Sequence, residues 1–430
     1  MTKNASVSTP TPATGRLGVL LPGLGAVSST LIAGVMAARK GGASPIGSIS
    51  QLDFLPNPAN PDEAGPAIRD ALSLASLDDL VFGGWDPISA NALEAAETAG
   101  VLESRDIAPI SGELEGIVTM PAVFDQDWVR NIDPIRVKEL TSKWDAALAL
   151  IDDIERFREE QDCDRLVMVW CGSTEVYRPA SEVHESIESF ERGLKDNDPN
   201  IAPSQIYAYA AMITETPYAN GSPNVTCETG YMEQLAEERQ VPLSGKDFKT
   251  GQTLIKTIIA PALRARMLGL RGWFSTNILG NRDGLVLDDP DSFKAKEVSK
   301  LGVLDNILQP ERHPELYGEI DHEVRINYYP PRGDQKEGWD SIDIFGWMGY
   351  PMQIKVNFLC RDSILAAPIV LDLVLFMDLA ARAGESGAQE WLSFYFKAPQ
   401  TLPGAPDSTI EHDLFLQRDN LLTQLVNWSK

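Results

Sequence analysis

The chain has 430 residues, of which 43% are hydrophobic, and its 37 basic and 62 acidic residues give a net charge of −25 at pH 7. A chain of this size buries a large core and divides into about two or three domains. The negative charge argues against nucleic acid and anionic membranes as partners, so a small anionic ligand would need a local basic pocket. The four cysteines have no metal-ligand spacing and the four histidines do not cluster, which indicates a reducing cytoplasm and predicts no metal centre. Residues 1–14 lack the regions of a signal peptide and are expected to form a disordered leader.

The first predicted element is a strand, a glycine turn and a helix. Residues 17–36 carry no charge and are long enough to span a membrane, but Pro22, Gly23 and Gly25 interrupt the run. We therefore predict a short buried strand at its start and a helix that ends near Arg39.

This pattern is typical of a dinucleotide-binding motif. Gly23 would allow the turn, and Gly25 would let a pyrophosphate approach the amides of Ala26 and Val27 at the helix N-terminus. Ser28 stands where the third glycine is usual, so the motif alone is a weak signal and an ordinary structural turn remains the alternative.

Two more segments are expected in the same α/β layer. Residues 80–82 are predicted to form a buried strand, which Asp86 follows shortly. Apolar residues recur at helical spacing between 138 and 157, which predicts a core helix without catalytic function.

A central parallel strand is predicted at 165–171, because this run is apolar throughout. Ser173 and Thr174 follow it, at the end where α/β sheets bind ligands. Residues 206–213 are also predicted to be a strand, and the turn Asn220–Pro223 would follow that strand at the cofactor.

The stretch 244–300 is predicted to face an anionic substrate. Its small-residue loop precedes an apolar helix, whose first amides would either bind phosphate or be capped in the ordinary way; this loop comprises Thr250, Gly251, Gln252 and Thr253. The next polar loop either converges on a ligand or builds turns; its residues are Asn277, Asn281 and Asp283. Lys296 and Lys300 lie one helical turn apart, which fits either a bound anion or a solvated helix face.

Beyond Lys300 the pattern changes to paired strands. Residues 324–329 and 353–359 are strand-like, and a turn at 346–351 joins two such segments. This predicts a mostly antiparallel sheet with one covered face. A helix at 362–383 then returns to the first domain.

Two lysines stand apart in the second half of the chain. Lys336 lies in a loop fixed by proline and glycine, where Asp334 would orient its ammonium or simply neutralise it. Lys397 is flanked by aromatic residues, so it is either partly buried and suited to proton transfer, or extended to the surface.

Five ordered motifs together resemble the myo-inositol-1-phosphate synthase family. They are SGKDFKTGQT, STNILGNRDG, FKAKEVSK, RGDQKEGWD and FLCRDSILAAPIVLDL. The resemblance runs from about Gly15 to the C-terminus. The chain differs from the eukaryotic pattern at Arg282, where asparagine is usual, and in the CETG that follows the NGSP turn, so it is similar to the bacterial branch.

The resemblance implies an α/β fold in three parts. Residues 15–253 and 363–430 would form a Rossmann-like NAD-binding domain that C-terminal helices close. Residues 254–362 would form an inserted α+β domain for catalysis and oligomerisation. The implied assembly is a homotetramer, and interface aromatics are expected between 255 and 361, although they could instead pack within one domain; they are Trp339, Phe345, Trp347 and Tyr350.

The implied reaction converts D-glucose 6-phosphate to 1L-myo-inositol 1-phosphate by oxidation, enolisation, aldol closure and reduction. Tightly bound NAD would be regenerated in each turnover. Whether the reaction also requires a monovalent or divalent cation is left open. Two alternatives remain at this stage: an NAD-dependent phosphosugar dehydrogenase that releases NADH, and a nucleotide-binding scaffold without turnover.

The resemblance also implies the site residues. The catalytic residues would be Asp247, Lys296, Lys336 and Lys397. The substrate-binding residues would be Thr250, Gly251, Gln252, Asn277 and Lys300. The cofactor-binding residues would be Gly23, Gly25, Ala26, Val27, Ser28, Asp86, Ser173, Thr174, Gly221, Ser222, Asn281, Asp283, Asp334 and Asp362.

The implied roles divide the chemistry among several lysines. Lys296 would exchange the C5 hydroxyl proton, with Asp247 as relay. Lys336 and Lys397 would stabilise the aldehyde and enolate oxygens, and the substrate phosphate or a side chain would remove the C6 proton.

Overall fold

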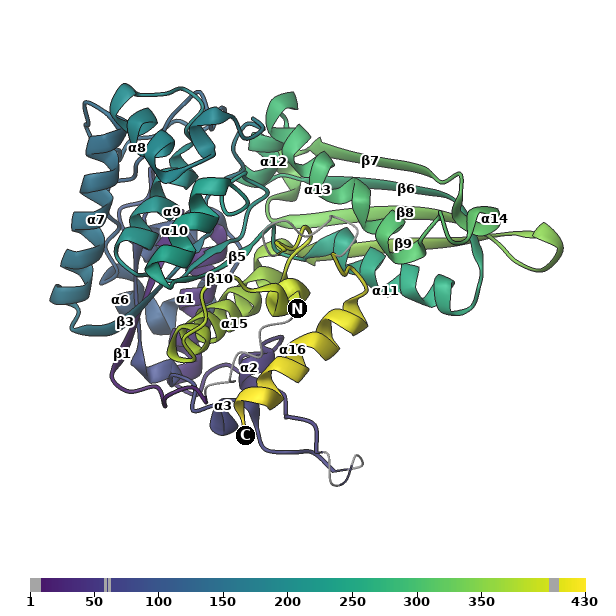
Figure 1. The fold of residues 1–430 in the computed structure, drawn as a ribbon, viewed down its shortest axis with the longest axis horizontal. Coiled ribbons are helices and arrows are strands. Elements are labelled where there is room, and N and C mark those ends of the chain that lie inside the picture. The colour runs from purple at the N-terminus through teal and green to yellow at the C-terminus, as the bar shows by residue number, and fades with distance from the viewer. Residues whose placement is uncertain (1–8, 58–59, 61–62, 402–409) are drawn as a thin grey trace.

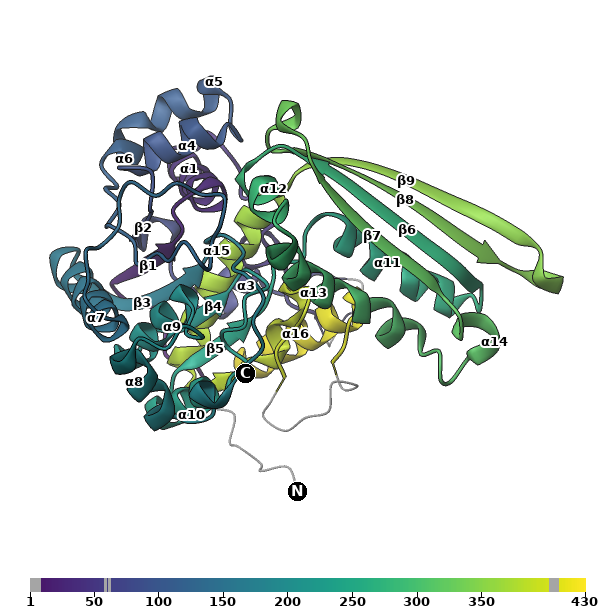
Figure 2. The ribbon, with the colours of Figure 1, turned by 90° about the horizontal axis from the view of Figure 1, so that it is seen from above.

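The computed structural model describes residues 9–57, 60, 63–401 and 410–430, with the side chains of 293 and 295–302 excepted. Residues 1–8 of the expected leader lie outside this description. Residues 9–14 have no regular structure, yet Ala13 donates a 3.1 Å backbone hydrogen bond to Ser73. Two sheets lie side by side in the molecule (Figures 1 and 2).

The first sheet is parallel and has the strand order β10-β5-β4-β3-β1-β2. Its strands are β1 (Arg16–Pro22), β2 (Leu80–Trp85), β3 (Cys163–Trp170), β4 (Tyr218–Asn220), β5 (Pro242–Gly245) and β10 (Gly387–Ala388). The predicted strand–turn–helix is confirmed, because β1 leads through a glycine turn into α1 (Ala26–Arg39). The predicted central strand is also confirmed as β3.

Helices cover both faces of this sheet, and the alternating side chains of β1 show how. Leu17, Val19 and Leu21 belong to one apolar core, whereas Leu20 belongs to the other. The helices of the first core include α1, α4 (Ala92–Ala99), α6 (Ser111–Glu115), α15 (Asp362–Arg382) and α16 (Leu414–Trp428). The helices of the second core include α7 (Lys143–Glu160), α8 (Ile187–Asp196), α9 (Pro203–Ile213) and α10 (Gly230–Arg239).

The strand predicted at 206–213 is wrong, because this run lies in helix α9. Pro203 occupies the first turn, where its missing amide costs nothing, and residues 203–212 are all buried. A helix buried on every side has no polar face, so its sequence cannot be distinguished from a buried strand by periodicity. The turn Asn220–Pro223 follows β4 instead.

Helix α15 is long and apolar enough to cross a membrane, yet 67% of its apolar window is buried inside the protein. It packs beside α1 in the first core, and it is the one such helix among the described residues. We read it as a core helix.

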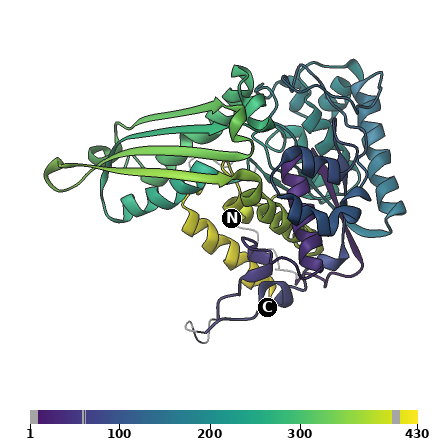
Figure 3. The same ribbon diagram turned by 180° about the vertical axis from the view of Figure 1, so that it is seen from behind.

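The second sheet has the order β7-β6-β8-β9, with one parallel and two antiparallel pairings, as the mostly antiparallel prediction requires. Its strands are β6 (Gly269–Leu279), β7 (Asp321–Tyr328), β8 (Gln335–Phe345) and β9 (Pro351–Arg361). Helices α11 (Gly251–Ala265) and α13 (Pro290–Leu308) cover one face. The opposite face carries no helix (Figure 3).

Several short helices complete the fold. They are α2 (Ile49–Leu52), α3 (Ile68–Ala71), α5 (Ser104–Ile107), α12 (Arg282–Leu287) and α14 (Pro314–Tyr317). Helix α12 matters most for the site, because it follows β6 where the second sheet meets the first.

Candidate active site

A cavity of about 430 Å³ opens at the carboxyl ends of the parallel strands and extends to α12 and the start of α15. Parallel α/β sheets bind ligands at this edge. Most of the predicted residues line it: Gly23, Gly25, Ala26, Val27, Asp86, Ser173, Thr174, Gly221, Ser222, Asp247, Thr250, Asn281, Asp283, Asp362 and Lys397. The predicted residues Ser28, Gly251, Gln252, Asn277, Asp334 and Lys336 do not line it.

The turn between β1 and α1 has the features that a pyrophosphate requires. Gly23 has φ +80°, and a Cβ there would lie 2.3 Å from the Cα of Gly172, so only glycine fits. A Cβ at Gly25 would meet no atom within 4 Å, which leaves room for a ligand. No side chain caps α1, so its first amides are free to bind an anion. Ser28 instead donates to the carbonyl oxygen of Gly23 at 2.9 Å and holds the turn.

Asp86 follows β2, the strand next to β1, which is where dinucleotide folds place the acid that binds a ribose. Its Oδ1 accepts hydrogen bonds from the amides of Ile88 (2.9 Å) and Ser89 (2.6 Å). Burial raises the pKa of Asp86, although these amides and Arg282 oppose the rise. The second carboxylate oxygen remains available to a ligand.

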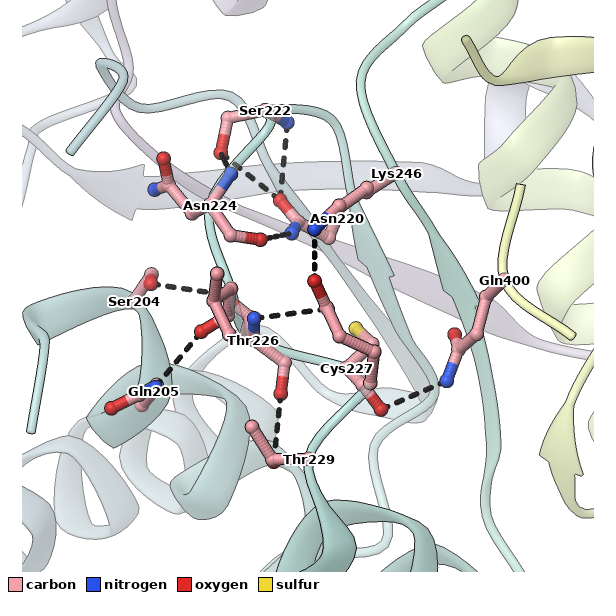
Figure 4. A network of polar contacts seen from close by, with 12 residues as sticks. Ser204, Gln205, Asn220, Ser222, Asn224, Thr226, Cys227, Thr229, Lys246 and Gln400 are labelled. Carbon is pink, nitrogen blue, oxygen red and sulfur yellow. Dashed lines mark hydrogen bonds and ion pairs between the residues drawn. The ribbon is translucent and has the colours of Figure 1, made fainter. Parts of the chain in front are cut away.

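A polar network holds the turn after β4 (Figure 4). The Asn220 amide donates to the carbonyl of Asn224 at 3.0 Å, and its oxygen accepts from the amide and the hydroxyl of Ser222. Lys246 pairs with Glu228 from the neighbouring segment. These contacts fix Gly221 and Ser222 at the cavity.

Lys336 and Asp362 form an ion pair of 2.9 Å at the junction of the two sheets. Burial opposes both charges, but each holds the other in its ionised form: the pKa of Asp362 lies below its usual value because of Lys336 and Lys397, and that of Lys336 lies above. Asp362 is also the first residue of α15, where the helix dipole favours an anion. The expected pairing of Lys336 with Asp334 is therefore corrected, since Asp362 is its partner.

Asp334 serves the loop instead. Its Oδ1 accepts from Asn281 at 2.8 Å and from Ser363 at 3.3 Å. Burial raises the pKa of Asp334 to about 6, and Asp362 adds to the rise.

Lys397 lines the cavity and pairs with Asp247 at 3.0 Å. Its side chain is 7% exposed, so the alternative that this lysine extends to the surface is wrong. Its aromatic neighbours indicated this burial, but no sequence pattern indicated the acidic partner, which lies 150 residues away.

The predicted phosphate loop forms the start of α11, with Thr250 as its N-cap and no side-chain cap. Gly251 has φ +57°, and a Cβ there would lie 3.5 Å from Asp362 Oδ1 and 3.7 Å from Lys336 Nζ. Gln252 turns toward the second sheet, where it donates to Asp340 at 3.2 Å and accepts from Asn277. Asn277 is in strand β6, so the predicted polar loop begins two residues later, after Leu279.

Lys296 and Lys300 lie in α13, and their side chains are outside the described residues.

Two residues that the sequence reasoning missed are near the site. Glu175 lines the cavity directly after Thr174, and burial raises its pKa to about 7. Lys249 contacts Gln417 of α16, and burial lowers its pKa to about 7. The position of Glu175 after a central strand was a usable signal.

Within the described part of the chain, no group of three or more His, Cys, Asp or Glu side chains could hold a metal ion. The four cysteines are free thiols.

Known proteins resemble this chain in sequence and in structure. The family model described as myo-inositol-1-phosphate synthase matches residues 17–426. Inositol-3-phosphate synthase 1 of Bacteroides thetaiotaomicron is 54% identical over 409 residues, which cover 94% of each chain. Isozyme 1 of inositol-3-phosphate synthase from Arabidopsis thaliana is 32% identical over 91% of this chain and 82% of its own. The crystal structure of inositol-3-phosphate synthase from Caenorhabditis elegans matches with a TM-score of 0.89 and 27% identity, over 98% of this chain and 87% of that one.

This chain is a Rossmann-type, NAD-binding enzyme, as its parallel sheet, its glycine turn and its two lysine–carboxylate pairs indicate together with the family match. The sequence similarity to inositol-3-phosphate synthases over nearly the whole chain identifies the family. The chain belongs to the myo-inositol-1-phosphate synthase family, whose members are isomerases of inositol biosynthesis.

Proposed function

We propose that this enzyme cyclises D-glucose 6-phosphate to 1L-myo-inositol 1-phosphate, and that its cavity holds NAD throughout the turnover. The observation that carries the proposal is the pair of lysine–carboxylate contacts, Lys336–Asp362 and Lys397–Asp247, beside a dinucleotide cavity. Family membership supports the substrate and the product. When bound, NAD would accept a hydride from C5 of the substrate and return it in the last step.

The cofactor would lie along the edge of the parallel sheet. Its pyrophosphate would meet the first amides of α1 beside Gly25, a ribose would meet Asp86, and the nicotinamide side would face Asp362. The buried ion pair with Lys336 keeps Asp362 ionised in the dry site, which suits it to orient a polar group.

The proton transfers need groups on both sides of the sugar. Lys296 would exchange the C5 hydroxyl proton with Asp247 as relay, and the 3.0 Å contact between Asp247 and Lys397 supports a relay through this carboxylate. Lys336 and Lys397 would stabilise the aldehyde and enolate oxygens, since ammonium groups in a low-dielectric site stabilise oxyanions strongly. The substrate phosphate would meet Thr250, Gly251 and Lys300.

Gln252 and Asn277 would support the substrate from the side of the second sheet. Gln252 bonds to Asn277, and the Oδ1 of Asn277 is buried without a partner among the described residues. A buried acceptor without a donor is costly, so a substrate hydroxyl is a natural partner for it.

Residues 254–362 would form a separate catalytic and oligomerisation unit, and the other two segments, 15–253 and 363–430, the cofactor domain. The unit would pair with other copies in a homotetramer, through the sheet face that carries no helix. The free thiols and the acidic surface fit a cytoplasmic enzyme.

Product identification tests the reaction. Purified protein, glucose 6-phosphate and a catalytic amount of NAD should give an inositol monophosphate by NMR, with no net rise in nicotinamide absorbance. Stoichiometric NADH would instead identify a phosphosugar dehydrogenase, and absence of any turnover would identify a scaffold. The same assay with and without a chelator, in sodium, potassium or ammonium buffers, determines whether a cation is required.

Replacement of Lys296 tests its assigned role. Lys296→Ala should abolish product while NAD binding persists, because binding does not need the C5 proton acceptor. Near-normal turnover in this variant would refute the role.

A further inference from the structure

The charges around the cavity are unbalanced. Its described lining includes five carboxylates: Asp86, Glu175, Asp247, Asp283 and Asp362. It includes two cationic side chains, Arg282 and Lys397. Lys336 and Lys397 neutralise Asp362 and Asp247. Among the described residues, the other three acids of the lining form no ion pair; they are Asp86, Glu175 and Asp283. NAD brings a doubly charged pyrophosphate into this site. Because like charges repel strongly in a partly desolvated cleft, the dinucleotide requires a cationic counterpart.

Lys397 is not available for that purpose, since it is paired with Asp247 at 3.0 Å on the cavity floor. Arg282 differs: it makes no hydrogen bond and no ion pair with any residue that the structure describes, although it attracts Asp86 over a longer distance. It is also exposed while it lines the cavity. An arginine without a partner in a carboxylate-rich cleft is placed to meet an anion.

The position of Arg282 defines which anion it meets. It is the first residue of α12, on the side of the second sheet, whereas the glycine turn with Gly25 lies on the first sheet. The cavity includes both of these and also Asp86, and Arg282 is close enough to Asp86 to oppose the rise in the pKa of this acid. In such folds the pyrophosphate lies at the glycine turn, next to the ribose that the acid binds, so it is the anionic group of NAD nearest to both.

We propose that Arg282 binds the pyrophosphate of NAD from the side opposite the glycine turn. The amides of Ala26 and Val27 hold one side of the pyrophosphate, and the Arg282 guanidinium holds the other with charge-assisted hydrogen bonds. The cofactor thereby connects the two parts of the fold. This inference rests on the NAD site of the proposed function and adds to it a residue that determines cofactor affinity.

The test is calorimetric titration of nucleotide-free protein with three probes: NAD, ADP-ribose and adenosine. Arg282→Gln should weaken NAD and ADP-ribose by about tenfold to a hundredfold, which is the usual effect of losing hydrogen bonds to a charged group. Adenosine lacks the pyrophosphate, so its affinity should change by less than about twofold. Arg282→Lys should be intermediate, because lysine keeps the charge but loses the planar fork.

Arg105→Gln is the matched control. Arg105 is 78% exposed, contacts only nearby acids and does not line the cavity, so NAD affinity should be unchanged. Salt provides a second readout: NAD affinity of the unaltered protein should fall with ionic strength more steeply than that of Arg282→Gln. If the glutamine variant fails to fold, Arg282→Ser, which also removes the charge, takes its place in this comparison.

Two results would overturn the inference. One is NAD affinity within twofold of the unaltered protein in Arg282→Gln, and the other is an equal loss for adenosine and ADP-ribose. Unaltered protein that binds no NAD would overturn the cofactor site itself, and so would be distinguishable from failure of Arg282 alone.

Discussion

Lys336 of β8 and Asp362 of α15 meet at 2.9 Å, and this contact joins the second sheet to the helix that returns to the first core. Both side chains are largely buried, at 12% and 21% exposure. A buried ion pair of this kind stabilises the fold little compared with an apolar pair. The loss of one partner is nevertheless costly, because the other charge is left buried without a counterion. The contact therefore links the stability of the junction to the electrostatics of the site.

Replacement of Lys336 should affect both properties. Lys336→Met leaves Asp362 without its counterion, so we expect unfolding free energy to fall by about 2 to 4 kcal/mol and turnover by at least about a hundredfold. Urea unfolding and product assays measure the two effects. Lys195→Met, on α8 away from the cavity, is the control; it should leave turnover unchanged and lower unfolding free energy by less than about 1 kcal/mol, the value of its contact with Trp144. Turnover near normal in Lys336→Met would exclude the assigned role.

The Lys397–Asp247 pair should behave as one unit. Lys397→Met and Asp247→Asn should each lower turnover by about a hundredfold to a thousandfold, and the double variant should be no slower than the slower single variant. Single-turnover kinetics measure this, and circular dichroism checks the fold. Effects that multiply would show that the two groups act independently.

Gly251 should be required for its backbone conformation. Alanine at φ +57° is strained by about 1 to 2 kcal/mol, and relief of this strain would change the backbone of the loop, although the added Cβ would meet Lys336 and Asp362 only at ordinary contact distances. Gly100 is a matched control, because it has φ +62° and open space around it but lies at the end of α4. We expect both alanine variants to lose similar stability in thermal unfolding, and only Gly251→Ala to lose affinity for glucose 6-phosphate. Equal affinity in the two variants would contradict a phosphate-binding role.

Asp334 should contribute a pH dependence of stability. Its pKa rises from 3.8 to about 6 on folding, so the native state binds the proton more tightly than the unfolded chain does. Stability must then fall as pH rises from about 4 to 6 and level off above that range. Relative to Asp334→Asn, the unaltered protein should lose about 1 kcal/mol of unfolding free energy between pH 5 and 7. Parallel pH profiles for the two proteins would contradict the raised pKa.

Assembly should depend on the exposed aromatic residues of the second sheet and its turns. Trp347 is 89% exposed and Tyr350 is 68% exposed on the turn between β8 and β9, an unusual number of aromatic groups for a free surface. Trp347→Ser should dissociate the proposed tetramer and lower activity, measured by light scattering at assay concentration. Ile46→Ser, which also removes an exposed apolar side chain (79%), should do neither. A fully active monomer would refute the coupling of assembly to activity.

The sequence predicted strands β1, β2 and β3 of the first sheet because their signals are local, whereas β4, β5 and β10 were not predicted. The run at β1 is apolar, ends at a glycine turn and continues as a helix, and each step has a short-range cause. The same reasoning failed for α9, where complete burial removed the polar face that marks a helix. Periodicity reports exposure, so it carries no information where nothing is exposed.

It was harder to predict which site residues form ion pairs with each other than to predict which residues belong to the site. Asp334 stands two residues from Lys336 and was the natural candidate, but Asp362 reaches the ammonium because β8 and β9 pair in register, with Gln335 opposite Arg361. Lys397 and Asp247 likewise meet only through the fold. Ion pairs between distant residues depend on strand register and helix placement, which one sequence does not encode in any short pattern.

The parallel sheet is completed late in the chain. Strand β10 and the central helix α15 both follow the second sheet in sequence, yet α15 supplies much of the apolar core around β1 and α1. During synthesis, one face of the sheet therefore stays partly uncovered until α15 has been made, because α1, α4 and α6 cover only part of it. Such contacts between distant segments slow folding and expose surface that aggregates. A fragment that ends before α15 should consequently depend on chaperones, and the cofactor cavity should appear only after the last third of the chain has been made.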